Sequence, residues 1–475
     1  MNRHKMTVGF IAYLFVVAST VSVVKSAEIV FKTQPCDGGV EILGVDEKDG
    51  FSGYDLVIPQ TISGKQVVKI GRNAFRECKS LKTVEMPKGL KHIDTCAFSE
   101  CKSLKSIVIP NSVNKIGEYA FSECTAMTNV TLSEELEEIE EGVFEKCNSL
   151  KTIKLTKKIK KIGEDAFRFS GIRSITLNEC LETIDEDAFE GCRSLTSITL
   201  PKSMKNFGRS PFSDSGLRTV ILQDGIEEIG ETAFAGCGSL ESIKFPKSLS
   251  RIKRAAFSNC DSLKSINLPE KLEVIEEEAF RSCDALCQIE LPSKIQRIEK
   301  KAFEDCLGLS QIKLPDSLTE IGESAFEESG LESITIPNGI TEIREGTFAD
   351  CDKLTSVVFS KNVTTIGRSA FFRCSALKSI SFTEGLEEIE YHAFWACDSL
   401  TSIAFPNGLK GIAQESFASC DNLSSISLPD SLEEIGEKAF QYSPIKMVVL
   451  PSNTSVGKNA FDDNVKVTRK KNQSK

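Results

Sequence analysis

Residues 81–103, with the sequence LKTVEMPKGLKHIDTCAFSECKS, are one copy of a unit that recurs along most of the chain. The pattern of this unit is L-x-x-V-x-M-P-x-x-L-x-x-I-x-x-x-A-F-x-x-C-x-x, and its phenylalanine returns about every 23 residues. A unit of this length cannot bury its apolar side alone, so successive units must stack as the coils of a solenoid. The recurring phenylalanines are Phe75, Phe98, Phe121, Phe144, Phe167, Phe189, Phe212, Phe234, Phe257, Phe280, Phe303, Phe326, Phe348, Phe371, Phe394, Phe417, Phe440 and Phe461.

Each unit contains two segments that favour extended backbone. Val84 and Met86 are two residues apart, the spacing of a strand with one buried face, and Pro87 ends that strand because proline has no amide donor. A second short extended piece is expected around Leu90 and Ile93, followed by a single helical turn that carries the phenylalanine inward. The sequence therefore predicts an α/β repeat solenoid with a parallel β-sheet on one face and short helical turns and second short strands elsewhere.

The domain boundaries follow from where the repeat begins and ends. Residues 1–26 have the pattern of a secretory signal peptide, with basic residues before a short apolar run and small side chains ahead of a cut after Ser26. Residues 27–55 are expected to form an N-terminal cap, because the ends of a solenoid need to be shielded from water. The repeat spans residues 56–461 in about eighteen coils, and residues 462–475 form a basic polar tail.

The composition excludes several classes of function. The formal net charge is −10 and the pI is near 5.3, whereas a nucleic-acid-binding protein needs a surplus of Lys and Arg to neutralise phosphates. No apolar run of about 20 residues follows the signal peptide, so we expect no membrane span in the mature chain. His4 lies in the signal peptide, and His92 and His392 lie in distant repeats. The sequence has no nucleophile, phosphate-loop or metal-ligand motif, so we expect neither enzymatic activity nor a cofactor or metal site.

Seventeen cysteines behind a secretory signal would ordinarily indicate disulfides. Thirteen of them, however, lie three residues after the repeat phenylalanine. Stacked equivalents would lie about 4.8 Å apart with parallel Cβ vectors, whereas a disulfide needs Cβ atoms about 3.8 Å apart. We therefore expect a buried ladder of free thiols. Cys36, Cys96, Cys180 and Cys287 lie outside this ladder and remain candidates for disulfide pairing.

The unit is specific enough to indicate a family. From about Leu56 to Phe461 the chain resembles the leucine-rich-repeat surface proteins of the BspA type. This resemblance implies a right-handed leucine-rich-repeat coil, secreted or exposed at a cell surface. Several members of the family are regarded as adhesins, so the implied partner is an extracellular protein or a cell-surface ligand. The positions that carry the likeness are Leu56, Val57, Ile58, Pro59, Ile62, Gly64, Val67, Ile70, Gly71, Ala74, Phe75, Cys78 and Leu81.

The exposed positions of the first predicted strand indicate where a partner would bind. The residue before the central apolar residue is Ser or Thr in most units, and the residue after it is often Thr or Ser but apolar in some units. One interpretation is an extended sheet face that binds a large partner through many weak hydrogen bonds with apolar anchors. The other is that hydroxyl side chains simply suit exposed strands. The candidate partner-binding residues are Ser174, Thr176, Ser197, Thr199, Ser333, Thr335, Ser379 and Ser381.

Two further hypotheses concern assembly and modification. The alternative hypothesis is that the chain does not recognise a foreign partner but associates with itself, as a structural component of the cell envelope or extracellular matrix. The sequence has five Asn-x-Ser/Thr sequons, which could accept glycans only in a eukaryotic secretory pathway. The candidate glycosylation sites are Asn129, Asn362, Asn422 and Asn453, and the fifth sequon is at Asn472 near the end of the basic tail.

Overall fold

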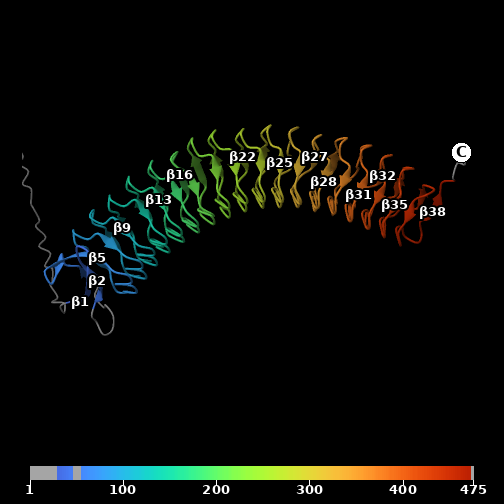
Figure 1. The fold of residues 1–475 in the computed structure, drawn as a ribbon. Coiled ribbons are helices and arrows are strands. Elements are labelled where there is room, and N and C mark those ends of the chain that lie inside the picture. Colours follow the sequence, from blue (N-terminus) through green and yellow to red (C-terminus); the bar gives the residue numbers. More distant parts are fainter. Residues whose placement is uncertain (1–28, 46–54, 472–475) are drawn as a thin grey trace, which may run out of the picture.

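The structure, a computed structural model, describes residues 29–45 and 55–471. The chain winds into one elongated, curved solenoid whose coils follow one another in sequence order from the blue end to the red end of the arc (Figure 1). Strands pair with strands of the neighbouring coils, as a repeat of this length requires. The predicted signal peptide, residues 1–26, lies outside the described residues.

Each coil, with two exceptions given below, contributes a first short strand to a parallel arrangement that we call ladder one. Equivalent residues pair one coil apart, so that Ile153 lies opposite Ile175. The central side chain points into the core and its two neighbours point outward, because side chains alternate between the faces of a strand. Ladder one consists of β3 (Asp55–Val57), β6 (Thr83–Glu85), β8 (Ser106–Val108), β10 (Asn129–Thr131), β12 (Thr152–Lys154), β14 (Ser174–Thr176), β16 (Ser197–Leu200), β18 (Thr219–Leu222), β20 (Ser242–Lys244), β22 (Ser265–Asn267), β24 (Gln288–Glu290), β27 (Ser333–Thr335), β29 (Ser356–Val358), β32 (Ser402–Ala404), β34 (Ser425–Ser427), β36 (Met447–Leu450) and β38 (Lys466–Arg469).

A second parallel arrangement, ladder two, runs along another side of the coils. Its members are the second short strands that the sequence predicts, and they pair in separate short sheets. In most of them a buried aliphatic residue aligns with that of the next coil, as Ile139 aligns with Ile162. Ladder two consists of β5 (Lys65–Ile70), β7 (His92–Ile93), β9 (Lys115–Ile116), β11 (Glu138–Ile139), β13 (Lys161–Ile162), β15 (Thr183–Ile184), β17 (Asn206–Phe207), β19 (Glu228–Ile229), β21 (Arg251–Ile252), β23 (Val274–Ile275), β25 (Arg297–Ile298), β26 (Glu320–Ile321), β28 (Glu342–Ile343), β30 (Thr365–Ile366), β31 (Glu388–Ile389), β33 (Gly411–Ile412), β35 (Glu434–Ile435) and β37 (Ser455–Val456).

The two ends of the solenoid differ from its middle. At the N-terminal end β1 (Phe31–Cys36) and β2 (Gly39–Val45) form an antiparallel hairpin, and β2 pairs in parallel with β5. The short strand β4 (Thr61–Ile62) also pairs with β5, in the antiparallel direction. At the C-terminal end β38 pairs with β36, so ladder one continues into the segment that the sequence assigns to a tail.

The third side of each coil is a turn stabilised by the neighbouring coil. The residues two before and two after each repeat phenylalanine from Phe75 to Phe440 have positive φ, and around Phe257 these are Ala255 at 51° and Asn259 at 58°. The amides of Ala255, Phe257 and Asn259 donate to main-chain carbonyls of the next coil over 2.9, 3.0 and 2.8 Å. An α-helix needs negative φ throughout and amides that bond within the segment. The described residues therefore contain no helix, and the prediction of helical turns and of an α/β class was wrong.

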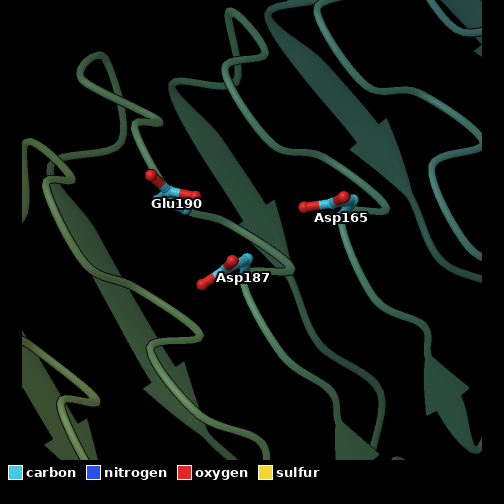
Figure 2. Close-up of side chains that lie close together, drawn as sticks. All are labelled: Asp165, Asp187 and Glu190. Carbon is cyan, nitrogen blue, oxygen red and sulfur yellow. The ribbon is translucent and has the colours of Figure 1, made fainter.

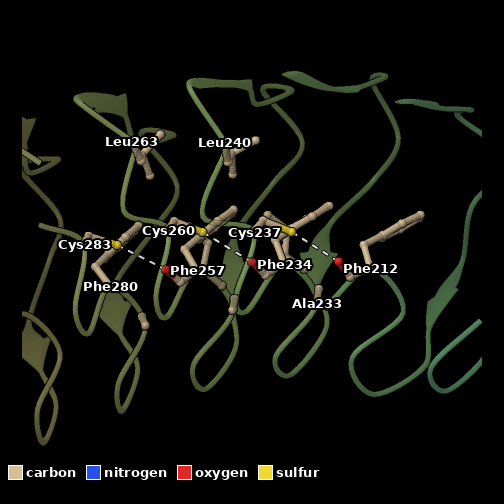
Figure 3. Packing of buried hydrophobic residues seen from close by; sticks show 14 of the residues in the cluster. Phe212, Ala233, Phe234, Cys237, Leu240, Phe257, Cys260, Leu263, Phe280 and Cys283 are labelled. Atoms are coloured by element: carbon tan, nitrogen blue, oxygen red, sulfur yellow. Dashed lines mark hydrogen bonds between the residues drawn. The ribbon is translucent and has the colours of Figure 1, made fainter. Parts of the chain in front are cut away.

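The core is a continuous stack of the repeat phenylalanines. From Phe75 to Phe461, successive ring centroids are 5.0–6.0 Å apart and the ring planes differ by at most 17°. Beside the rings, twelve of the thirteen ladder cysteines are buried, and Cys78 in the first coil is half-buried. Each buried thiol donates to the main-chain oxygen of the phenylalanine one coil earlier, as Cys260 does to Phe234 over 3.3 Å (Figure 3). The predicted thiol ladder is confirmed.

Ladder one is not a single uninterrupted sheet. Residues 311–313 and 379–381 occupy strand positions of the repeat but form no strand, and only an isolated bridge joins Val358 to Ser381. The pairing divides ladder one into short sheets of two to four strands. The predicted parallel sheet is therefore present as a series of segments along one side of the solenoid.

Neighbouring coils pack so closely that some glycines have no room for a side chain, whereas others do. An alanine Cβ at Gly436 would lie 2.4 Å from the main-chain nitrogen of Gln414, whereas a Cβ at Gly411 would meet no atom within 4 Å. We expect Gly436→Ala to lower the free energy of unfolding by about 1–3 kcal/mol. In contrast, Gly411→Ala should raise it by roughly 0.5 kcal/mol, because alanine loses less backbone entropy on folding. Urea denaturation of both variants checks this, and shifts of the same sign and size would contradict it.

Candidate binding surface

The eight predicted partner-binding residues all have exposed side chains on the outer side of ladder one. They fall into two groups separated by several coils. The first hydroxyl patch lies on β14 and β16, and the second lies on β27 and on the strandless coil at 379–381. The structure therefore brings these residues together in two places and not in one continuous site. The first patch contains Ser174, Thr176, Ser197 and Thr199, and the second contains Ser333, Thr335, Ser379 and Ser381.

An exposed aliphatic side chain lies beside each hydroxyl patch. Ile221 on β18 is 44% exposed and lies directly opposite Thr199 in the strand register. Val358 on β29 is 58% exposed, lies opposite Thr335 and bridges to Ser381. Each patch thus combines hydrogen-bonding groups with an apolar side chain that water covers in the isolated protein, which is the composition of a protein-binding patch.

The second hydroxyl patch also adjoins two depressions in the surface. The coil at 311–313 forms no strand, and on either side of it lie cavities of about 550 and 580 Å³. Ser333 and Thr335 line the first cavity, and Lys313 and Asp316 line both. The second hydroxyl patch therefore borders a concave part of the surface as well as the exposed Val358.

No cysteine of the described residues takes part in a disulfide. All seventeen lie within the described residues and all are free thiols, so none of the four disulfide candidates is paired. Cys180 and Cys287 are exposed, and Cys36 and Cys96 are half-buried. Burial raises the pKa of the ladder thiols, in Cys237 to about 12 and in Cys192 to about 11, so these groups stay protonated at neutral pH.

One cluster of carboxylates lies near the turn side of the coils. Asp165, Asp187 and Glu190 can place one oxygen atom each within 4.8 Å of one another (Figure 2). Arg168 supplies the opposite charge, with ion pairs of 2.5 Å to Glu190 and 3.4 Å to Asp165. Burial raises the pKa of Asp165 and Asp187. Arg168 thus already neutralises part of the negative charge of this cluster, and we assign the cluster a structural role.

A family of repeats accounts for nearly all of the solenoid. The family described as BspA type leucine-rich repeat region (6 copies) matches residues 51–172, 160–287, 274–372 and 341–468. The chain belongs to this family. The resemblance inferred from the repeat pattern is thus confirmed.

Solved structures of other leucine-rich-repeat proteins align with this BspA-type chain. A leucine-rich repeat protein from Bacteroides ovatus is 25% identical, covers 94% of this chain and 99% of its own, and has a TM-score of 0.48. A leucine rich cell surface protein from Faecalibacterium prausnitzii is 21% identical, with 94% and 96% coverage and a TM-score of 0.32. The pneumococcal vaccine antigen PcpA is 20% identical, with 77% and 92% coverage and a TM-score of 0.39. No curated protein matches the chain.

Four sequon asparagines of the BspA-type chain are accessible, and the fifth, Asn472, lies outside the described residues. Asn129, Asn362, Asn422 and Asn453 are all exposed, and Asn129 lies on β10 of ladder one. The side chains of Asn362 and Asn422 donate to main-chain oxygens one coil earlier over 2.8 Å. In addition, the part of the chain that the structure describes has no helix that is long and apolar enough to cross a membrane.

The structure reveals an aromatic group that the sequence shows only in part. The sequence places Tyr391, His392 and Trp395 together in one coil. The structure adds Phe372 from the coil before, stacked on Trp395 with ring centroids 4.9 Å apart. His392 is hydrogen-bonded to Glu415 over 2.9 Å, and its ring is stacked on that of Tyr391. The spacing of one repeat between Phe372 and Trp395 was the signal that would have found the pair.

Proposed function

We propose that this BspA-type leucine-rich-repeat protein is secreted or exposed at a cell surface, where it binds another protein or cell through the outer face of ladder one. The observation that supports this proposal is the second hydroxyl patch, in which Val358 is 58% exposed and has Thr335 and Ser381 as its neighbours across the ladder. Binding hot spots have this composition, with an apolar anchor inside a polar rim. Function is thus assigned to recognition and not to catalysis.

The extended shape of the surface suits a large partner. A stable protein complex buries about 800 Å² on each side, more than one short patch provides. The two hydroxyl patches lie on the same side of the solenoid, and a matrix protein or cell surface that contacts both gains from their combined area. Two weak contacts on one rigid body reinforce each other, because the second forms at a high effective concentration once the first is made.

The test is solid-phase binding of the chain to fibronectin, fibrinogen and laminin at physiological salt. We expect saturable binding to at least one, weakened about tenfold or more by Val358→Asp, because a buried unpaired carboxylate costs more than the lost methyl groups. Val108→Asp is the matched control, since Val108 occupies the same strand position, is 63% exposed and lies outside both patches. Equal binding by both variants, or an equal loss, would contradict the proposal.

The self-associating alternative gives a different result in the same experiment. A structural component would bind none of the three matrix proteins but would assemble with itself as its concentration rises. Sedimentation velocity over a hundredfold range of concentration distinguishes the two functions, because a monomeric adhesin keeps one sedimentation coefficient throughout.

A further inference from the structure

The shortened coil at Ser170 and Gly171 changes the shape of the surface. Where the next coil has Cys192-Arg193-Ser194-Leu195, this coil has only Ser170-Gly171-Ile172 between its turn and its first strand. Ser170 takes the place of the ladder cysteine, and its hydroxyl lies 3.4 Å from the Cys192 sulfur. A Cβ on Gly171 would lie 2.0 Å from the main-chain oxygen of Asn148, so only glycine fits where the shortened coil passes so close to its neighbour.

The missing residue leaves a cavity between the two flanking coils. It is an open depression in the surface with a volume of about 580 Å³. Thr125 and Asn148 line the side toward the preceding coils, and Arg193 and Ser194 line the side toward the following coil. Ser170 and Gly171 belong to the coil between them. Because the cavity lies before the strands of ladder one, it is separate from the two hydroxyl patches.

An exposed aromatic ring lines this cavity. Phe169 is 39% exposed and lies over Gly191, where a Cβ would come within 2.3 Å of the ring. The Phe169 ring fills the space that a side chain on Gly191 would need. The φ of 64° at Gly191 does not by itself require glycine, because other coils hold residues such as Asn259 at this position with a similar φ. The equivalent residues of the other two shortened coils are Asp214 and Glu328. Among the three shortened coils, the aromatic ring is therefore particular to this one.

The charges around the cavity are balanced except at one residue. Lys146 is ion-paired with Glu145 over 2.8 Å and with Glu123 over 3.6 Å. The Arg193 side chain is exposed and makes no hydrogen bond or ion pair with any described residue. Its guanidinium can thus take a ligand carboxylate in a two-pronged contact without breaking an existing pair. Thr125 and Ser194 add hydroxyl groups at the same cavity.

We propose that this cavity binds a six-membered sugar ring that carries a carboxylate, as sialic and uronic acids do. Arg193 pairs with the carboxylate, and Thr125 and Ser194 exchange hydrogen bonds with the sugar hydroxyl groups. The Arg168 guanidinium lies over the Phe169 ring, 5.1 Å from its centroid, and Gly191 lies against it, so the remaining exposed part of the ring contacts the C–H groups of the sugar. Each chemical group of the proposed ligand matches a side chain that lines the cavity. A neutral sugar would leave Arg193 without a partner, and a phosphate group alone would not use the aromatic ring. The inference does not rest on the proposed function, because it concerns another part of the coil.

Isothermal titration of the full chain tests the proposal with four probes. These are 3′-sialyllactose, a tetrasaccharide of hyaluronan that contains glucuronic acid, lactose as the neutral form of the first, and inorganic phosphate. We expect saturable binding of one or both acidic sugars and at least about tenfold weaker binding of lactose and phosphate. The two acidic probes distinguish a sialic acid from a uronic acid. Absence of binding by both at millimolar concentration overturns the proposal.

Variants assign the binding to the cavity. Arg193→Gln should weaken acidic-sugar binding at least about tenfold, because it removes a charge-assisted hydrogen bond. Phe169→Asn should do the same while keeping a residue that tolerates the positive φ of 51° at this position. Arg173→Gln is the control, because Arg173 is an exposed arginine of the same coil that does not line the cavity. Circular dichroism verifies folding of each variant. An unchanged affinity in Arg193→Gln, or an equal loss in Arg173→Gln, overturns the assignment.

Discussion

Replacement of Phe257 by alanine is expected to destabilise the protein by about 3–5 kcal/mol, the usual cost of removing a buried phenylalanine. Phe257 is fully buried near the middle of the stack, and its ring lies 5.6 Å from both Phe234 and Phe280. The resulting cavity separates two halves of a one-dimensional array, in which stability is passed on only between neighbours. We therefore also expect the single denaturation curve to broaden or split into two transitions, which urea unfolding followed by circular dichroism would record.

The matched control for this prediction is the last ring of the same stack. Phe461 is half-buried and has one stacked neighbour, Phe440, at 5.3 Å. Phe461→Ala should cost only about 1–2 kcal/mol, in proportion to the smaller apolar area that it removes from contact. It should also leave one transition, because Phe461 lies at the end of the phenylalanine stack and its loss does not divide the stack into two parts. A urea denaturation curve of Phe257→Ala that is as steep as that of the parent protein would contradict the view that each coil is stabilised only by its neighbours.

The thiol ladder is expected to make the protein unfold at alkaline pH. Twelve buried thiols have pKa values raised from 9.0 by burial, to about 12 in Cys283 and Cys420. Their folded pKa is higher than their unfolded pKa, so the stability that they contribute is complete below pH 9 and is lost as pH rises through the folded values. At pH 10 each unfolded thiol ionises with a gain of about 1.4 kcal/mol. Twelve such gains are comparable to the roughly 5–15 kcal/mol that holds an ordinary domain together.

A serine variant isolates this contribution from that of lysines and tyrosines. The chain itself shows that serine fits the ladder, because the Ser443 hydroxyl donates to the Phe417 oxygen as the cysteines do. Changing Cys237, Cys260, Cys283 and Cys306 to serine should reduce the slope of unfolding free energy against pH. The expected reduction between about pH 9.5 and 11 is roughly 1.4 kcal/mol per pH unit for each thiol removed. The slope is compared because the substitutions also change stability at neutral pH. An unchanged slope, or thiolate absorbance that rises before the fold is lost, would contradict the prediction.

The repeat pattern predicted the parts of the fold that depend on side-chain periodicity. Val84 and Met86 are two positions apart, and this spacing identified the strand. The nearly constant interval between one repeat phenylalanine and the next, as from Phe75 to Phe98, identified the stacked core. The turn was predicted wrongly because helical and left-handed backbone share the same apolar spacing over a few residues. Ala255 and Thr232 have positive φ although neither is a residue type that favours it. Hydrogen bonds to the next coil impose this conformation, and such bonds are invisible in a single unit.

The sequence predicted which side chains are exposed on the surface, but not where the cavities beside them lie. The alternation within each strand correctly gave the exposure of Ser333 and Thr335, and the repeat gave the exposure of Val358. The loss of strand structure at residues 311–313, beside which the two cavities lie, has no counterpart in the pattern, since Gln311 and Lys313 fit it well. The cavity at Phe169 could have been anticipated, because the one-residue deletion at Gly171 is visible in the sequence.

The direction of the bonds between coils also determines how the solenoid responds to mechanical load. Ladder one, ladder two and the turn amides all join one coil to the next, so tension applied at the two ends pulls on successive coils in series. Each coil can then peel away by itself, releasing about 75 Å of extended chain while its neighbours stay folded. A tether built in this way lengthens in steps under shear instead of breaking at once, and it can rewind when the load is removed because every released coil still has a folded neighbour as a template.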